Sequence, residues 1–193
     1  MDELTHPVFG TQPTLSDGVV WLTHWRLDDA VALGDFNMDP DHRRWFDQPE
    51  PSSDAAERRA HGVEVIHRWW REWVDGTSIT FALRLAEDGP AIGEADLQPR
   101  PQLAANIAYA VVPAHRGSGY ASRAIRLLGE AGLTRFGFRR IELSCDIGNT
   151  ASARAAEKAG FTFESMRAGT ALYEEIEEWK GSPRDERLFI LER

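Results

Sequence analysis

Short stretches of alternating or continuous apolar residues, rich in β-forming side chains, divide the chain into regular elements. They predict strands at residues 19–25, 78–86, 91–98, 105–112, 140–147, 161–166 and 186–191. Apolar residues at helical spacing, or a capping residue with a terminating glycine, predict helices at 28–36, 54–74, 119–136 and 149–160. This order is typical of a mixed α/β fold in which helices flank one central, mostly antiparallel sheet of about seven strands. A helix joins the 105–112 and 140–147 strands, so these two are expected to be parallel neighbours.

Chain length and composition favour one soluble domain. The 193 residues suit a single domain at 18–193 after an N-terminal extension at 1–17. No apolar run approaches the roughly 18 residues of a membrane span, and residues 1–14 lack the basic and apolar parts of a secretory signal. We therefore expect no membrane partner. The single cysteine, Cys145, excludes an internal disulfide and favours the reducing cytoplasm.

Charge is distributed unevenly along the chain. The formal net charge is −9, which argues against nucleic-acid binding because phosphate backbones require Lys and Arg. The segment from His115 to Arg140 nevertheless holds six arginines and one acidic residue, Glu130. A local positive field in an acidic protein suits a small polyanionic ligand better than a nucleic acid.

The most informative segment is a glycine-rich turn, Arg116-Gly117-Ser118-Gly119, between the 105–112 strand and the 119–136 helix. The first N–H groups of a helix lack intrahelical partners and lie at the positive end of its dipole. Gly117 and Gly119 permit positive φ and a close backbone approach, and Arg116 adds a full charge. Such a turn suits a pyrophosphate, although it also suits a plain strand–helix connector. It lacks the Gly-Lys-Ser/Thr of a nucleotide P-loop and the third glycine of a dinucleotide site.

Two motifs extend this prediction. Arg116-x-x-Gly119-x-Ala121 resembles the acetyl-CoA motif Arg/Gln-x-x-Gly-x-Gly/Ala of the GNAT superfamily of N-acetyltransferases. Residues 149–152 (Asn-Thr-Ala-Ser) and 157–161 (Glu-Lys-Ala-Gly-Phe) resemble a helix and turn of its RimJ/RimL-like branch, which includes ribosomal-protein α-amine acetyltransferases. The resemblance covers the order of elements from about residue 19 to residue 191. It implies the GNAT fold and an acyl-CoA-dependent N-acetyltransferase.

The same resemblance implies which residues hold acetyl-CoA, the expected co-substrate. Its pyrophosphate would lie on the backbone N–H groups of Arg116, Gly117, Ser118, Gly119, Tyr120 and Ala121. The strand end at Ala110, Val111 and Val112 would bind the pantetheine arm, where this strand splays from the 140–147 strand. An N–H at Val111 or Val112 would polarise the thioester carbonyl. Asn149 and Ser152 would contact the pantetheine or cysteamine end, unless they serve only the start of their helix.

Catalytic groups are less clearly indicated. The attacking amine must lose a proton, and the departing sulfur must gain one. Many family members use a tyrosine seven residues after the asparagine as the acid, but this chain has Ala156 there. Rim-type enzymes often carry a glutamate near the start of the last strand of the meander, where this chain has Asn106. The candidates are therefore Ser152 and Tyr173 as acids, and Glu94 and Asp96 as bases. Glu94 and Asp96 also suit a solvent-facing edge, and catalysis by positioning alone stays open.

The expected acceptor is a primary amine, either a protein N-terminal α-amine or a small molecule. The acidic run at residues 174–178 favours a cationic acceptor, if it is not simply a solvated turn. The histidine spacing predicts no metal site. The resemblance also implies a homodimer. Two other functions stay open: an antibiotic-modifying or succinyl-type acyltransferase of the same fold, and a non-catalytic CoA-binding sensor or interaction module.

Overall fold

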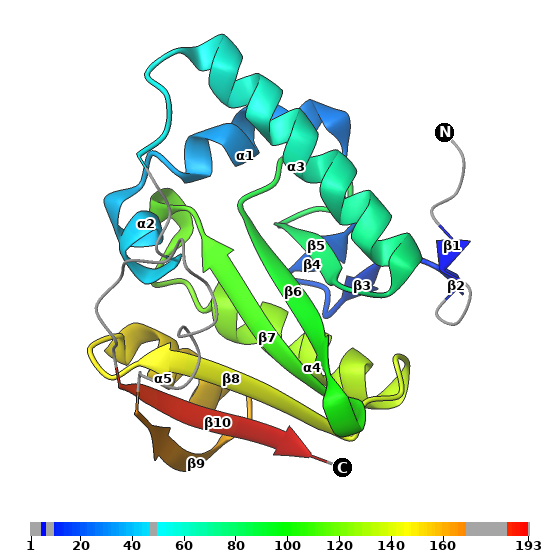
Figure 1. Cartoon of the computed structure of the whole chain (residues 1–193), viewed down its shortest axis with the longest axis vertical. Helices are drawn as coiled ribbons and strands as arrows, with labels where there is room; N and C mark the ends of the chain where they lie inside the picture. The colour runs from blue at the N-terminus through cyan, green and yellow to red at the C-terminus, as the bar shows by residue number, and fades with distance from the viewer. Residues whose placement is uncertain (1–4, 7–9, 47–49, 169–184, 193) are drawn as a thin grey trace.

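A single eight-stranded sheet forms the centre of the computed structural model, which describes residues 5–6, 10–46, 50–168 and 185–192 (Figure 1). Across the sheet the strands run β3 (Leu15–Ser16), β4 (Trp21–Thr23), β5 (Ile79–Arg84), β6 (Gly93–Arg100), β7 (Ala104–Val111), β8 (Arg140–Asp146), β10 (Glu186–Glu192) and β9 (Thr162–Arg167). Neighbouring strands are antiparallel except β7 and β8, which are parallel as predicted. Strands β1 (Thr5–His6) and β2 (Gly10–Thr11) pair separately.

The sheet has one strand more than the seven predicted, and it begins inside the predicted 1–17 extension. Leu15 pairs with Leu22 and Ser16 with Trp21, so β3 joins the sheet through β4. Between them the Asp17 carboxylate accepts hydrogen bonds from the N–H groups of two following residues and closes the turn. A two-residue strand is too short to leave an alternating pattern in the sequence.

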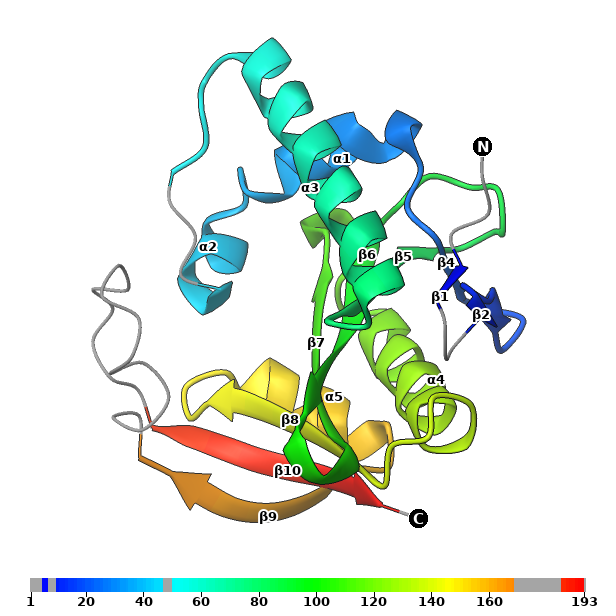
Figure 2. The same ribbon diagram turned by 45° about the vertical axis from the view of Figure 1, so that its right-hand side comes forward.

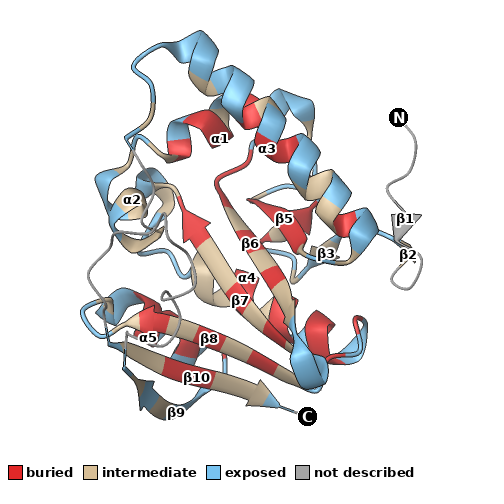
Figure 3. Cartoon of the chain, viewed as in Figure 1, coloured by how far each residue is buried: buried red, intermediate tan, exposed pale blue. Residues whose placement is uncertain are grey.

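Helices cover both faces of the sheet (Figures 1 and 2). α4 (Tyr120–Thr134) and α5 (Thr150–Lys158) pack on one face, and α1 (Ala30–Phe36) and α3 (Ala55–Asp75) pack on the other. Side chains of consecutive strand residues point to opposite faces of a sheet. In β5, Phe81 packs in the hydrophobic core under α4, and Ala82 packs in the core under α1 and α3. Buried residues accordingly follow β5 and the inner sides of the helices (Figure 3). None of the described helices is long and apolar enough to cross a membrane.

The predicted helices are confirmed, but one further short helix was missed. The Asp54 carboxylate caps α3 as expected, accepting from the N–H groups of Ala56 and Glu57 at 2.7 and 3.1 Å. The missed helix is α2 (Pro40–Phe46), which contains no fully buried residue and therefore shows no apolar stripe. Pro40 at its first position was the available signal.

Strands β7 and β8 separate along their length, as the family resemblance implied. Their pairing covers three residue pairs at the start of each strand and ends at Asn106 and Glu142. Beyond this point the rest of β7 stays paired with β6, and the rest of β8 with β10. An opening between the two strands follows.

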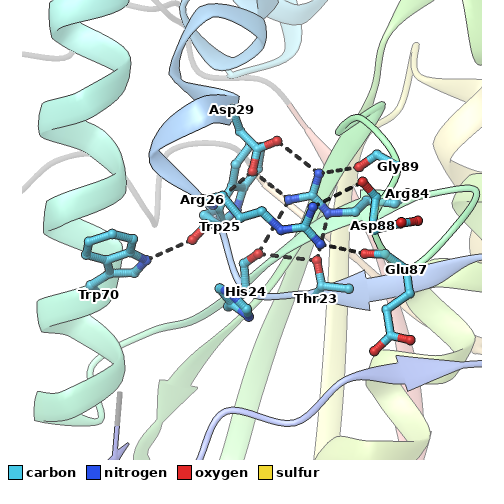
Figure 4. Close-up of polar contacts among 10 residues, drawn as sticks. All are labelled: Thr23, His24, Trp25, Arg26, Asp29, Trp70, Arg84, Glu87, Asp88 and Gly89. Atoms are coloured by element: carbon cyan, nitrogen blue, oxygen red, sulfur yellow. Dashed lines mark hydrogen bonds and ion pairs between the residues drawn. The ribbon is translucent and has the colours of Figure 1, made fainter. Parts of the chain in front are cut away.

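A buried ion pair ties the start of α1 to the sheet (Figure 4). Arg84, at the end of β5, is fully buried, and its guanidinium donates to both carboxylate oxygens of Asp29 at 2.9 and 2.5 Å. Its remaining donors reach the Thr23 hydroxyl and the Gly89 carbonyl, each at 2.8 Å. The Arg84 charge is paired with that of Asp29, and the guanidinium N–H groups have acceptors. This cluster therefore holds the start of α1 in a fixed position on β5.

Candidate functional site

A cavity of about 1290 Å³ lies where β7 and β8 separate. Its walls come from α2, the end of β7, the glycine-rich turn, β8 and the start of α5. The predicted residues that line it are Ala110, Val111, Arg116, Gly117, Gly119, Tyr120, Ala121, Asn149 and Ser152. The fold thus brings the two sequence motifs to one cavity. Val112 and Ser118 are not among its lining residues.

The glycine-rich turn has the backbone that an anion site requires. Gly117 and Gly119 have φ of +79° and +81°, in the left-handed region. A Cβ atom built on either glycine would meet no atom within 4 Å, so the space beside the turn is open. No side chain caps the N-terminus of α4 at Gly119. Its first N–H groups are therefore available to a negative ligand at the positive end of the helix dipole.

Arg116 is already engaged within the protein. Its backbone N–H donates to the Pro113 carbonyl at 3.2 Å, so it is the weakest of the predicted pyrophosphate donors. Its guanidinium Nε donates to the Val111 carbonyl at 2.9 Å. The terminal nitrogens pair with Asp39 and Asp41 at the start of α2. In this state Arg116 ties α2 to the turn instead of presenting a free charge.

The backbone of β7 distinguishes between the two predicted oxyanion donors. The N–H of Val112 donates to the Ile92 carbonyl at 2.9 Å and is therefore occupied. Backbone groups of successive strand residues point to opposite sides, so those of Val111 point away from β6 and toward the opening. Val111 is the remaining candidate for the oxyanion donor.

At the start of α5, a polar chain runs from Asn149 to Tyr109. Asn149 Oδ1 caps the helix by accepting the N–H of Ser152 at 3.0 Å. The Tyr109 hydroxyl, from β7, donates to Ser152 Oγ at 3.1 Å. Burial raises the pKa of Tyr109, so its hydroxyl keeps its proton and remains a donor. Tyr109 was not predicted from the sequence, yet it lines the cavity beside the predicted acid.

Cys145, on β8, completes this cluster. It lines the cavity, is 7% exposed and hydrogen-bonds with the Ser152 hydroxyl. Burial raises the pKa of its thiol, which does not favour a nucleophile.

The family model of the acetyltransferase (GNAT) domain matches residues 20–162. The chain belongs to the GNAT acetyltransferase family. This confirms the predicted fold class and an acyl-CoA-dependent N-acetyltransferase. None of the curated proteins compared with the chain matches it in sequence.

Solved GNAT structures share the fold over nearly the whole chain. Mycobacterium smegmatis RimJ, solved with CoA-disulfide, is 24% identical with a TM-score of 0.76, covering 97% of this chain and 90% of its own. RimL, a ribosomal L7/L12 α-N-protein acetyltransferase solved with coenzyme A, is 19% identical with a TM-score of 0.71, covering 94% and 97%. The microcin C7 self-immunity acetyltransferase MccE, solved with acetyl-CoA and AMP, is 16% identical with a TM-score of 0.72, covering 98% of each chain.

In this GNAT domain the two predicted bases lie outside the cavity. Glu94 and Asp96 project from β6 toward α3, on the face that carries Ala82 of β5. Burial raises the pKa of Glu94 to about 7, against the opposing charge of Arg68. Burial, with the charge of Glu94, raises the pKa of Asp96 well above its usual range. Neither carboxylate is among the lining residues, whereas Asn106 is. Their role as bases stays a prediction.

Two other predictions concern parts of the chain that lie outside the described residues. These are the alternative acid, Tyr173, and the acidic run at 174–178. Within the described part of the chain, no group of three His, Cys, Asp or Glu side chains is arranged to hold a metal ion.

Proposed function

We propose that this GNAT domain transfers an acetyl group from acetyl-CoA to a primary amine. The acceptor class is a protein N-terminal α-amine or a small-molecule amine. A protein α-amine is the named acceptor of RimL, and its fold is shared over most of both chains. RimJ, RimL and MccE were all solved with CoA or a CoA derivative, which supports the donor.

The glycine-rich turn beside the β7–β8 opening is the observation that carries the proposal. In our proposal, the N–H groups from Gly117 to Ala121 hold the CoA diphosphate. The pantetheine then runs along the free edge of β7, and the thioester lies in the opening beside Val111. An N–H donor at Val111 stabilises the oxyanion that forms when the amine attacks.

The transfer is a direct displacement in this proposal. The amine nitrogen attacks the thioester carbon, the C–S bond breaks, and the sulfur leaves with its electron pair. The Ser152 hydroxyl gives its proton to that sulfur and regains one from solvent, while the amine nitrogen releases one proton, which passes to solvent. Tyr109 supports this step, because its own O–H donates to Ser152 Oγ, so the serine hydroxyl can turn its proton from the Cys145 sulfur to the departing thiolate.

Replacing Ser152 with alanine is expected to lower kcat by about 10- to 100-fold, because the thiolate then leaves without a positioned proton. The dissociation constant of CoA should change by less than about 3-fold, since the diphosphate contacts remain. Tyr109→Phe should show a smaller loss of kcat. Ser165→Ala on β9, away from the cavity, is the matched control. Thiol release at saturating substrates measures the effect, and an unchanged kcat in Ser152→Ala would remove Ser152 from the mechanism.

The alkylation rate of Cys145 gives a second test of where acetyl-CoA binds. Because burial raises its pKa, alkylation by iodoacetamide at neutral pH should be slow in the folded protein and fast after denaturation. Saturating acetyl-CoA should slow it by a further 10-fold or so, since only the small ligand-free fraction reacts. Mass spectrometry of the cysteine peptide follows the reaction. Equal rates with and without acetyl-CoA would place the donor outside this cavity.

The activity itself is tested by calorimetry with acetyl-CoA, followed by thiol release with a panel of amines. The panel contains peptides with free and with blocked N-termini, and small-molecule amines. Release with free but not blocked peptides would support the protein acceptor, and release with small amines alone would support a small-molecule acceptor. Binding of acetyl-CoA without release for any amine would instead identify a CoA-binding sensor.

We also propose a cytoplasmic homodimer. A single, reduced Cys145 suits a reducing compartment. Sedimentation that gives the mass of one chain would reject the dimer.

A further inference from the structure

The short helix α2 forms one wall of the cavity, beside the end of β7 (Figure 1). Two contacts place it there. Arg116 binds Asp39 and Asp41 near its start, and Trp45 reaches Gly148, where a Cβ would lie 4.0 Å from its ring. The helix therefore connects the glycine-rich turn to the segment that begins α5, across the opening of the sheet.

His42 is the residue of α2 whose side chain calls for an explanation. Both of its ring nitrogens are buried, and neither has a hydrogen-bond partner among the described residues. The ring stacks on Phe46, with centroids 4.7 Å apart and planes 29° apart, which restricts its orientation. Its backbone N–H donates to Asp39 at 3.2 Å, so its main chain is also fixed. Buried polar atoms normally have partners, and this ring lines a cavity in which a ligand would supply them.

The surroundings of His42 favour its neutral form. Burial and the charge of Arg116 lower its pKa, and the nearby Asp39 carboxylate opposes them. A neutral imidazole at pH 7 has a free lone pair and can accept a proton. The other charged or titratable groups that line the cavity with His42 come from every wall: Asp41, Arg44, Arg100, Tyr109, His115, Arg116, Tyr120, Arg140, Glu142, Cys145, Asp146, Arg154, Lys158, Arg167 and Glu186.

We propose that His42 is the base that takes the proton lost by the acceptor amine. This rests on the proposed function above. The amine lone pair forms the N–C bond, the nitrogen then gives one proton to an imidazole nitrogen of His42, and the C–S bond pair leaves with sulfur. Ser152 protonates the departing sulfur, so the products are the amide and CoA thiol. The imidazolium then returns its proton to water, and Ser152 regains one from water.

Competing carboxylates are less well suited than His42. Glu142 is paired with both Arg140 and Arg167, and Asp41 is paired with Arg116. Among the carboxylates that line the cavity, Glu186 is the strongest rival, because its Oε2 is buried without a partner among the described residues. Although burial raises the pKa of Glu186, Arg167 opposes this and Ser144 gives the carboxylate a hydrogen bond, whereas neither nitrogen of the His42 ring has a hydrogen-bond partner among the described residues.

The test compares His42→Gln with the wild-type protein across pH, using the best acceptor amine. In the wild type, log kcat/KM should fall with a slope approaching about 2 at low pH, because both the amine and His42 become protonated. In His42→Gln the slope should fall to about 1, and kcat/KM at pH 7 should drop on the order of 100-fold. The affinity for CoA, measured by calorimetry, should stay the same and shows that the variant is folded. His61→Gln, on an exposed part of α3, is the control and should behave as wild type.

A second variant distinguishes loss of the base from a structural effect of the substitution. His42→Ala leaves space at the ring, so added imidazole should restore part of its rate while having no effect on the wild type. The proposal is overturned if His42→Gln keeps both rate and slope, or if it raises KM alone. It is also overturned if Glu186→Gln, and not His42→Gln, reduces the slope. If wild-type protein releases no thiol with any amine, the proposed function itself fails.

Discussion

Removing the carboxylate of Asp29 alone should destabilise the protein by about 3–5 kcal/mol, because it leaves the Arg84 charge buried and unpaired. Arg84 is fully buried and Asp29 is 7% exposed, so water cannot replace the lost partner without opening the packing between α1 and β5. The same carboxylate also accepts the Arg26 N–H at 2.8 Å, which the variant would leave without a partner. Urea unfolding of Asp29→Ala and wild type, followed by tryptophan fluorescence, measures the loss.

Two further variants separate the charge effect from general damage. Replacing both partners, Asp29→Leu with Arg84→Met, should recover much of the loss, because no uncompensated charge remains. Asp35→Ala breaks the half-exposed pair with Arg58 and should cost no more than about 1 kcal/mol. If Asp29→Ala proved no worse than Asp35→Ala, the buried pair would not hold the α1 layer on the sheet.

The parts of the site that are built from residues close together in the chain could be predicted from the sequence. Gly117 and Gly119 before an apolar helical stripe predict a turn with positive φ at a helix start, and the structure has both. Asn149 three residues before Ser152 predicts a capped helix, and Asn149 caps it. Such features depend on steric and hydrogen-bonding interactions between residues close together in the sequence, so the sequence alone is enough to predict them.

Parts of the site that depend on packing between distant elements were not predictable in this way. Tyr109 and Ser152 are 43 positions apart, and they meet because the Tyr109 side chain and α5 are on the same face of the sheet. The available signal was strand alternation, which places Tyr109 on the same face as Val111. The engagement of Arg116 with Asp39 also needed the missed helix α2. Its seven residues bury no side chain completely, so no periodic pattern indicated it.

The order of the last strands shows the same limit. The sequence predicts β9 and β10 as strands, but alternation within a strand says nothing about which neighbour it pairs with. β10 lies between β8 and β9, where Phe189 faces Leu143 on one side and Phe163 on the other. Glu94 and Asp96 were predicted as bases because they alternate on the strand next to Asn106, where Rim-type enzymes often carry a glutamate. Their face of β6 lies toward α3, and neither carboxylate is among the residues that line the cavity.

Replacing Gly119 with alanine should weaken acetyl-CoA binding on the order of 100-fold while costing only about 1–2 kcal/mol of stability. The stability cost arises because φ at this position is +81°, which an alanine adopts only with strain. The loss of affinity arises because the N–H groups that follow are held in place by this residue. Losing one or two charge-assisted hydrogen bonds to a diphosphate accounts for a change of that size. Calorimetric titration with acetyl-CoA measures it.

Gly137 at the other end of α4 provides the matched control, because it has the same φ of +81° and equally open space around its Cβ position. Gly137→Ala should therefore lose as much stability as Gly119→Ala but bind acetyl-CoA like the wild type. The comparison separates backbone strain, which the two variants share, from loss of the anion site, which belongs to one end of the helix alone. Equal affinities in the two variants would show that the diphosphate is held elsewhere, and the donor site proposed here would have to be abandoned.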